Sequence, residues 1–214
     1  MIIRHIGHAE FQIETESGIR IVTDPYDSSC GYPIHQIESD IVLISHSHHD
    51  HNAFELLKGE PRVFNRAGIY TPDINIKISA VRGFHDNEQG AKRGETLLFL
   101  IETEDLRIVH LGDLGCMIND EQVSILHDAD ILMIPVGGFY TIDAKLAWEV
   151  AEKLNARIIL PMHYKTRYNA EWPISGPDRF LEEAAGQNIL KEAEVLRVTS
   201  GDLVCHPRIV LFRF

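Results

Sequence analysis

Four potential metal ligands crowd into one short segment that follows directly on an apolar run. The run is 41–44, and the ligands are His46, His48, Asp50 and His51. Imidazole nitrogens and carboxylate oxygens are the donors that Zn²⁺ and similar divalent ions prefer. In extended chain, residues 46 and 48 point the same way, while Asp50 and His51 can turn toward a second point nearby. The segment therefore predicts a metal site, and one loop could serve two ions.

Further candidate ligands stand where other apolar runs stop. They are Asp24, His85, Asp113 and His163, which follow the runs 21–23, 78–84, 108–112 and 158–162. Chain that has just left a strand is positioned by a rigid scaffold but is free of the hydrogen-bond ladder, so ligands gather there in α/β proteins. Together with His46, these residues predict a single rim of ligands at strand ends.

Strand parity separates two candidates within one run. His110 and Asp113 fall on opposite faces of an extended segment, so they are not expected to bind the same ion. We predict Asp113 as the ligand, with Gly112 and Gly115 letting the backbone pass close to the site. We interpret His110 as a hydrogen-bonded core histidine. The alternative is that His110 contacts a metal ligand and orients it.

Two residues near the start of the chain are less clear from the residues alone. Asp24 either caps the turn that Pro25 begins or orients a ligating imidazole. His8 precedes a strand rather than ending one, which assigns it to a turn. The remaining histidines outside the ligand loop lack a comparable context and are interpreted as structural or surface residues: His5, His35, His127 and His206.

The elements that must position the ligands are short strands in the first half of the chain and a mixture of strands and helices after it. We expect strands at 2–6, 11–14, 19–23, 41–45, 76–81, 96–102, 106–111, 131–135, 157–161, 194–198 and 208–212. We expect helices at 52–57, 120–126, 144–154 and 177–185. This order predicts sheets packed together with helices outside, in a single layered α/β domain over residues 1–214.

Composition limits the function classes. The 214 residues carry a formal net charge of −12, which disfavours nucleic acid as a main partner because phosphate binding depends on Lys and Arg. No stretch approaches the roughly 20 apolar residues of a membrane span, and the first residues lack the apolar run of a signal peptide. Three scattered cysteines, Cys30, Cys116 and Cys205, fit reduced thiols. We expect a cytoplasmic protein without a membrane span.

Two long loops begin next to candidate site residues and are predicted to form substrate-binding rims. They are 26–39 and 165–176. Beside His163, the neighbours Tyr164 and Lys165 either contact an anionic substrate group or are a core tyrosine and a solvated lysine. Tyr140 is a weaker candidate for such a contact.

Taken in order, these residues resemble the metallo-β-lactamase superfamily. Its signature is His-x-His-x-Asp-His followed by distant His, Asp and His, and every position is filled: His46, His48, Asp50, His51, His85, Asp113 and His163. Shorter motifs are similar to the branch that contains bacterial ascorbate-phosphate lactonases and the phospholipase D that releases N-acylethanolamines. These motifs are Gly7-His8-Ala9, Gly112-Asp113-Leu114-Gly115, Pro135-Val136-Gly137-Gly138 and Pro161-Met162-His163-Tyr164-Lys165.

The resemblance implies a four-layer αββα sandwich and a pair of metal ions. One ion would be held by His46, His48 and His85, the other by Asp50, His51 and His163, with Asp113 bridging them. Two positions depart from the pattern: Cys116 stands where close relatives often have His, and the segment from Arg93 to Thr96 lacks a common Asn. Both departures spare the ligands, but they could alter substrate choice.

We therefore predict a hydrolase in which two divalent ions activate water against a phosphodiester, lactone or related ester. Zn²⁺ is the ion that we expect, with Mn²⁺ or Fe as alternatives. Asp50 and Asp113 are the predicted catalytic residues. The expected partner is a small-molecule substrate. The sequence is compatible with an anionic substrate, and also with assembly into a homo-oligomer. Alternatives are a di-iron redox protein, whose members usually have Glu at the position of His48, and a non-catalytic metal-binding protein. A nuclease of the superfamily would carry a large inserted domain.

Overall fold

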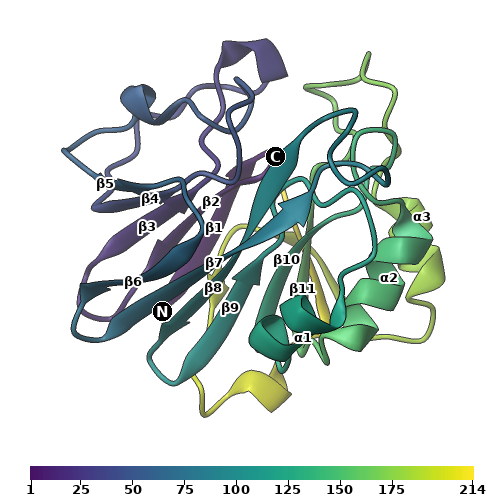
Figure 1. Ribbon diagram of the computed structural model, residues 1–214. Coiled ribbons are helices and arrows are strands. Elements are labelled where there is room, and N and C mark those ends of the chain that lie inside the picture. Colours follow the sequence, from purple (N-terminus) through teal and green to yellow (C-terminus); the bar gives the residue numbers. More distant parts are fainter.

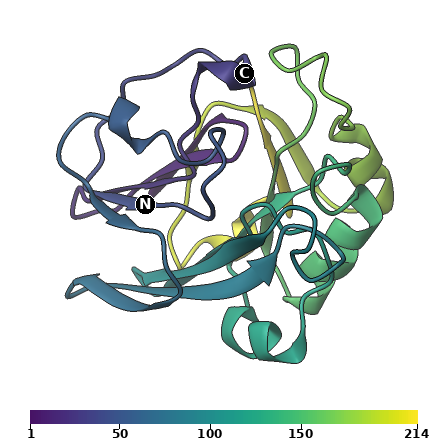
Figure 2. The ribbon, with the colours of Figure 1, turned by 45° about the horizontal axis from the view of Figure 1, so that its top comes forward.

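Two mixed β-sheets lie face to face in the computed structural model, which describes residues 1–214 (Figures 1 and 2). The smaller sheet contains β1 (Ile2–Gly7), β2 (Glu10–Glu14), β3 (Arg20–Thr23), β4 (Ile41–Leu43), β5 (Arg62–Phe64) and β13 (Leu196–Arg197). The larger contains β6 (Gly68–Asp73), β7 (Ile76–Phe84), β8 (Glu95–Thr103), β9 (Leu106–His110), β10 (Ile131–Pro135), β11 (Ile158–Met162), β12 (Ile189–Ala193) and β14 (Ile209–Phe212).

The strand order brings several carboxyl ends to one edge of the molecule. The six-stranded sheet runs β13-β1-β2-β3-β4-β5, and the eight-stranded sheet runs β12-β14-β11-β10-β9-β8-β7-β6. β3 and β4 are parallel, as are β9, β10 and β11, while β7 and β9 both run antiparallel to β8 between them. The segments that follow β3, β4, β7, β9 and β11 therefore leave the sheets at the same end, at the top of Figure 1.

Apolar side chains fill the space between the sheets and the space beneath the helices. Phe11 and Phe99 are fully buried where the two sheets face each other. A second apolar cluster lies between the other face of the eight-stranded sheet and α1 (Asp120–Leu126), α2 (Ala144–Lys153) and α3 (Asp178–Glu183). None of these helices is long and apolar enough to cross a bilayer.

The predicted two-sheet α/β fold is confirmed, with an uneven distribution of helices. All three α-helices cover the larger sheet (Figure 2). On the outer face of the smaller sheet, Val22 and Val42 pack against Phe54 and Leu57, in and beside the short 3₁₀ helix η2 (Phe54–Leu56). The expected helix at 52–57 is thus wrong in type and length. Ala53 at its start offers no side-chain hydrogen bond to the first turn, and the segment makes a single 3₁₀ turn.

Most other predicted elements are present, and the differences lie at sheet edges. β5, β6 and β12 were not expected, because each carries exposed or half-exposed residues and β6 contains Pro72. The strand expected at 194–198 is reduced to β13. Two further 3₁₀ turns, η1 (Ser28–Cys30) and η3 (Leu203–Cys205), complete the structure. Edge strands pair on one side only, so their sequences show little of the buried-strand pattern.

One histidine belongs to the core and not to the ligand rim. His5 stacks on Phe11 with ring centroids 4.1 Å apart, and its Nε2 donates a hydrogen bond to the carbonyl of His8 at 3.0 Å. Burial lowers the pKa of His5 to about 3, despite the opposing effect of that hydrogen bond. The interpretation of His5 as structural fits this environment.

Replacing His5 by Phe is expected to weaken the acid dependence of stability. Unfolded chain binds a proton at His5 near pH 6.5, whereas folded chain keeps the ring neutral down to about pH 3, so stability is lost as the pH falls between these values. From pH 7 to pH 5, the free energy of unfolding of metal-free His5→Phe protein should fall by about 2 kcal/mol less than that of the wild type. Urea denaturation at both pH values measures this difference.

The matched control is His35→Phe, because His35 is exposed and forms no ion pair. This variant should show the same fall as the wild type. If His5→Phe also matches the wild type, the buried ring contributes nothing to acid sensitivity.

Candidate metal centre

The ligand loop after β4 is tied to the end of β3 by Asp24. The backbone N–H of Ser45 donates to Asp24 Oδ1 at 2.7 Å, and the Ser45 hydroxyl donates to Oδ2 at 2.7 Å. His51 Nδ1 lies 2.9 Å from the same Oδ2. Asp24 thus fixes both the start of the loop and the orientation of the His51 ring. Of the two interpretations, orientation of a candidate ligand is the one that the geometry supports.

The carboxylate of Asp113 lies at the centre of the predicted ligands. Four imidazole Nε2 atoms surround it: His85 at 3.2 Å, His163 at 3.3 Å and His46 at 3.9 Å from Oδ2, and His51 at 3.3 Å from Oδ1. These five residues follow four different strands, β4, β7, β9 and β11, and the loop after β4 supplies both His46 and His51. The structure therefore brings together side chains that are far apart in sequence.

The other predicted ligands extend this cluster on two sides. His48 Nδ1 lies 2.9 Å from His46 Nε2, and Asp50 Oδ2 lies 3.7 Å from His51 Nε2. Donor atoms within 4.8 Å of one another fall into three groups: His46, His48 and His85; His8, Asp50, His51 and His163; and His46, His51 and Asp113. The third group shares His46 with the first and His51 with the second. All seven predicted ligands belong to at least one group.

His8 belongs to the site, although the residues alone assigned it to a turn. Its Nε2 lies 3.3 Å from Asp50 Oδ2, its ring centroid lies 4.2 Å from that of His163, and its carbonyl accepts the His163 backbone N–H at 3.0 Å. The turn between β1 and β2 lies at the same end of the sheets as the ligand loops, so the side chain of His8 lies beside them. The signal was the motif Gly7-His8-Ala9, which had been noted only as part of a resemblance.

His110 is a core histidine, as interpreted. Its Nε2 lies 3.0 Å from the carbonyl of Ala9, and its Nδ1 accepts the Gly112 backbone N–H at 3.1 Å. It belongs to none of the donor groups. The two residues are separated as predicted, but strand parity is not the reason, because β9 ends at His110 and Gly112 has a φ of 49°.

Glycine at two positions allows the strand ends to approach each other. A Cβ on Gly112 would lie 2.6 Å from the Ser45 Cβ, and Gly112 has a φ of 49°. A Cβ on Gly115 would lie 2.3 Å from the backbone carbon of His85. A larger residue at either place would separate Asp113 from the ligands of neighbouring strands.

Three site residues with side chains adopt left-handed backbone conformations. The φ angles of His8, Asp24 and His163 are 52°, 41° and 51°. Such angles are uncommon outside glycine, although Asp and His tolerate them better than most residues. These three conformations indicate that the side chains of the site are held in place at a cost in conformational energy.

Buried polar atoms without hydrogen-bond partners concentrate in this cluster. They include Asp113 Oδ1, His51 Nε2 and His8 Nδ1. Buried polar groups are normally paired, because leaving one unpaired costs about 1–3 kcal/mol. Nitrogen and oxygen donors that converge without partners fit a divalent cation.

The protonation states also suit a cation. Burial lowers the pKa of His46 to about 3, with His51 adding to the effect, which favours the neutral ring that a metal ligand requires. Burial alone would raise the pKa of Asp113, but His163 and His51 hold it well below its usual value. For His51, the carboxylates of Asp113 and Asp24 overcome burial and raise the pKa. A proton and a metal ion would therefore compete for His51 Nε2.

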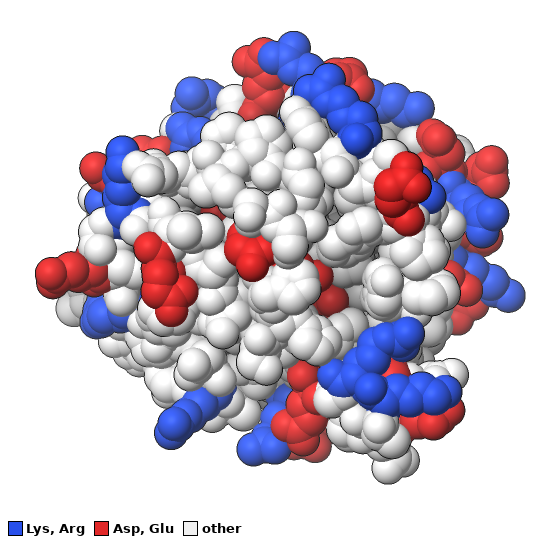
Figure 3. All heavy atoms as spheres, turned by 90° about the horizontal axis from the view of Figure 1, so that it is seen from above, with Lys and Arg blue, Asp and Glu red and all other residues white.

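A pocket of about 340 Å³ opens onto the cluster. Its lining consists of His48, His49, Asp50, His85, Arg93, Asp113, Tyr140, His163 and Trp172. Figure 3 looks onto this end of the molecule, where mostly uncharged surface surrounds a hollow that contains carboxylate atoms. Loop 165–176 contributes Trp172 to the lining, whereas no residue of loop 26–39 lines the pocket.

The predicted anion contacts next to His163 are not in this lining. Tyr164 is buried in the apolar cluster beneath the helices, and Lys165 does not reach the pocket. Tyr140 does line it. Cys116 is half-buried and is also absent from the lining. The core interpretation of Tyr164 is therefore the one that fits.

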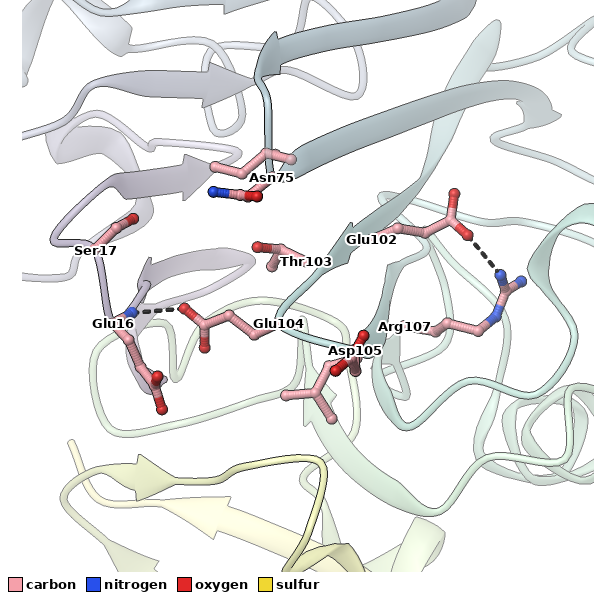
Figure 4. A pocket seen from close by; sticks show the side chains of 10 residues that line it. Glu16, Ser17, Asn75, Glu102, Thr103, Glu104, Asp105 and Arg107 are labelled. Carbon is pink, nitrogen blue, oxygen red and sulfur yellow. Dashed lines mark hydrogen bonds and ion pairs between the residues drawn. The ribbon is translucent and has the colours of Figure 1, made fainter.

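A larger hollow lies at the opposite end of the sheets, where the β2–β3, β6–β7 and β8–β9 turns meet (Figure 4). Its carboxylates include Glu16, Glu102, Glu104 and Asp105. Glu104 accepts the Glu16 backbone N–H, and Glu102 pairs with Arg107. No predicted ligand is found there, and Glu104 and Glu102 already have partners.

Residues 2–163 match the family model described as the beta-lactamase superfamily domain. The chain belongs to the metallo-β-lactamase superfamily. A crystal structure from Thermotoga maritima, described as a candidate Zn-dependent hydrolase of this superfamily, is 37% identical, covers 99% of this chain and 97% of its own, and superposes with a TM-score of 0.79. The superfamily predicted from the seven ligand positions is thus confirmed.

Curated archaeal relatives carry the name UPF0173 metal-dependent hydrolase. The protein from Nanoarchaeum equitans is 30% identical over 92% of this chain and 96% of its own length. The protein from Thermococcus onnurineus is 29% identical over 92% of this chain and 99% of its own length. The narrower resemblance to lactonases and a phospholipase D stays a prediction.

Adding Zn²⁺ to metal-free protein is expected to raise its free energy of unfolding, because the ion would pair donors that otherwise lack partners. At a concentration 1,000 times the dissociation constant, the gain should be about 4 kcal/mol. Urea denaturation with and without Zn²⁺ measures it. Asp113→Ala should lose most of the gain, whereas Glu16→Ala, in the acidic hollow of Figure 4, should keep it. Equal stabilisation of the Asp113→Ala protein would place the ion elsewhere.

Proposed function

We propose that this protein is a metal-dependent hydrolase that uses two divalent ions to activate water against an ester-type bond. The observation that carries the proposal is the buried Asp113 carboxylate surrounded by four imidazoles within 3.2–3.9 Å. Its relatives' names point to the same class of activity. A structural role alone would not require so many unpaired donors to face one another.

The donor groups suggest how the ions would be held. His46, His48 and His85 would hold one ion, and Asp50, His51 and His163 the other, with Asp113 reaching both. Nitrogen and oxygen donors suit Zn²⁺, which we propose as the ion, with Mn²⁺ or Fe as alternatives. His8 belongs to the second donor group, but its Nε2 lies 3.3 Å from Asp50 Oδ2, so we assign it to hold that carboxylate and not an ion.

Paired divalent ions lower the pKa of a bound water toward neutrality and stabilise negative charge on the group that is attacked. Asp50 is half-buried and lines the pocket, so it would orient the attacking oxygen and accept its proton. His8 would hold the Asp50 carboxylate in position from behind, at 3.3 Å. Asp113 would stay ionised throughout, because its pKa lies well below the usual value.

The pocket sets the size of the substrate. A volume of about 340 Å³ fits a small molecule, and its walls combine Tyr140 and Trp172 with the polar cluster. We propose a phosphodiester, a lactone or a related ester as the substrate class. Such substrates share an electrophilic centre that an activated water attacks.

His48→Ala and Asp113→Ala should each reduce metal-dependent hydrolysis to background while the fold survives, because each removes a proposed ligand. The measurement is a screen of phosphodiesters, phosphomonoesters, lactones and carboxylic esters with Zn²⁺- or Mn²⁺-loaded protein. Circular dichroism checks the fold, and elemental analysis gives the metal content. His127→Ala, at an exposed site, should behave as the wild type. Full activity in either ligand variant would refute the assignment.

Asp24→Asn should lower the affinity for Zn²⁺ by ~10–100-fold, because the carboxylate that orients the His51 ring is lost. Competition with a chromogenic chelator measures the affinity. Asp105→Asn is the matched control, since Asp105 is exposed and also has a positive φ, of 57°. An unchanged affinity in Asp24→Asn would mean that His51 is positioned without Asp24.

A further inference from the structure

Arg93 is the sole Lys or Arg whose side chain lines the candidate metal pocket. It shares that lining with His48, His85 and Asp113. Its guanidinium carbon lies 5.6 Å from the centroid of the Tyr140 ring, a distance at which cation and aromatic face attract each other. The positive charge is thus placed at the pocket wall beside the proposed reaction centre.

The guanidinium of Arg93 has no carboxylate partner, in a chain where acidic residues outnumber basic ones by 32 to 20. Arg20, Arg107 and Arg208 all form ion pairs with Asp or Glu, and the neighbouring Lys92 pairs with Glu88. Arg93 forms no ion pair and no side-chain hydrogen bond. Five N–H donors on a half-buried planar group are therefore available to a ligand.

Asp86 holds the Arg93 backbone in place. This buried carboxylate accepts the backbone N–H groups of Glu88, Gly90 and Lys92 at 2.8–3.0 Å, and that of Arg93 at 2.7 Å. The loop is also tied to the proposed ligand beside it, because the His85 N–H donates to the carbonyl of Gly94 at 3.0 Å. The backbone that carries Arg93 is thereby fixed relative to His85.

An aromatic wall connects Arg93 with the other side of the site. The Tyr140 and Trp172 ring centroids lie 6.0 Å apart, and Trp172 lies 6.3 Å from the His163 ring. Tyr140 is half-buried, with Arg93 near its face. A substrate in this pocket would therefore meet an apolar wall that ends in a positive charge.

We propose that Arg93 binds an anionic group of the substrate, a carboxylate or a phosphate, that is separate from the bond hydrolysed at the metal centre. This inference rests on the proposed function of the same site and narrows its substrate class to anionic esters. A planar guanidinium binds both oxyanions through paired hydrogen bonds. Lys165, the candidate anion contact from the sequence, does not line the pocket, whereas Arg93 does.

The test compares three p-nitrophenyl esters with the same leaving group and acyl chains of similar length. One chain ends in a methyl group, one in a carboxylate and one in a phosphonate. In Arg93→Gln, kcat/KM should fall by ~10–100-fold for the charged esters, mainly through KM, and by less than ~3-fold for the neutral ester. Arg93→Lys should recover part of the loss, and the ratio between the two charged esters identifies the preferred anion.

The matched control is Lys92→Gln, which removes one positive charge from the same loop outside the pocket. It should leave all three values within ~2-fold of the wild type, because an exposed charge is screened by salt. Equal losses for charged and neutral esters in Arg93→Gln would show that Arg93 only supports Tyr140. Equal losses in Lys92→Gln and Arg93→Gln would show a general charge effect. Either result overturns the proposal.

A binding measurement tests the anion subsite independently of the proposed hydrolase activity. Isothermal titration of the Zn²⁺-loaded protein with glutarate and with propylphosphonate requires no turnover. If none of the esters is hydrolysed, the hydrolase assignment loses support, but a ~10-fold weaker binding of either anion to Arg93→Gln than to the wild type would still support the anion subsite. Equal affinity in both proteins would reject it.

Discussion

The burial of the Asp113 carboxylate among four imidazoles is the constraint on which the rest of this structure depends. An ionised carboxylate in the interior is costly unless positive charge and hydrogen bonds compensate for it. His51 and His163 supply part of that compensation and hold the pKa of Asp113 low, yet Asp113 Oδ1 and His51 Nε2 keep no hydrogen-bond partner. A cluster of this kind is stable only with added positive charge, from protons or from metal ions.

The arrangement of the two sheets brings the compensating side chains to Asp113. Strands that are separated in sequence end at the same edge. The segments after β7, β9 and β11 each contribute one predicted ligand, and the loop after β4 contributes four. Close approach then has local costs. Gly112 and Gly115 remove side chains that would collide with the neighbouring loop ends, and His8, Asp24 and His163 adopt left-handed conformations. The apolar core between the sheets stabilises the fold enough for this strained edge to persist.

The sequence predicted the parts of this arrangement that follow from periodicity. Apolar runs with a ligand-type residue at the end located His46, His85, Asp113 and His163. The crowded segment after the first of these runs located His48, Asp50 and His51. The sequence missed β5, β6 and β12, because edge strands lack a buried pattern, and it overestimated the helix at 52–57. His8 was missed for a different reason. Its place depends on the β1–β2 turn lying beside β11, a long-range contact that no local pattern encodes.

The proposed metal ions would explain how a strongly acidic protein could bind the anionic substrate that we propose. Without metal ions, Asp50 and Asp113 would repel such a molecule from the pocket they share with Arg93. Two divalent ions would add four positive charges and reverse the local field, so that Arg93 and the metal centre would act on the anion together. Protons compete for the same positions, because His51 is held between Asp24 and Asp113 and its pKa is raised. Under this proposal, metal loading, protonation and anion binding are coupled through one group of side chains. The net charge of −12, which is summed over the whole chain, does not fix the sign of the field inside the pocket.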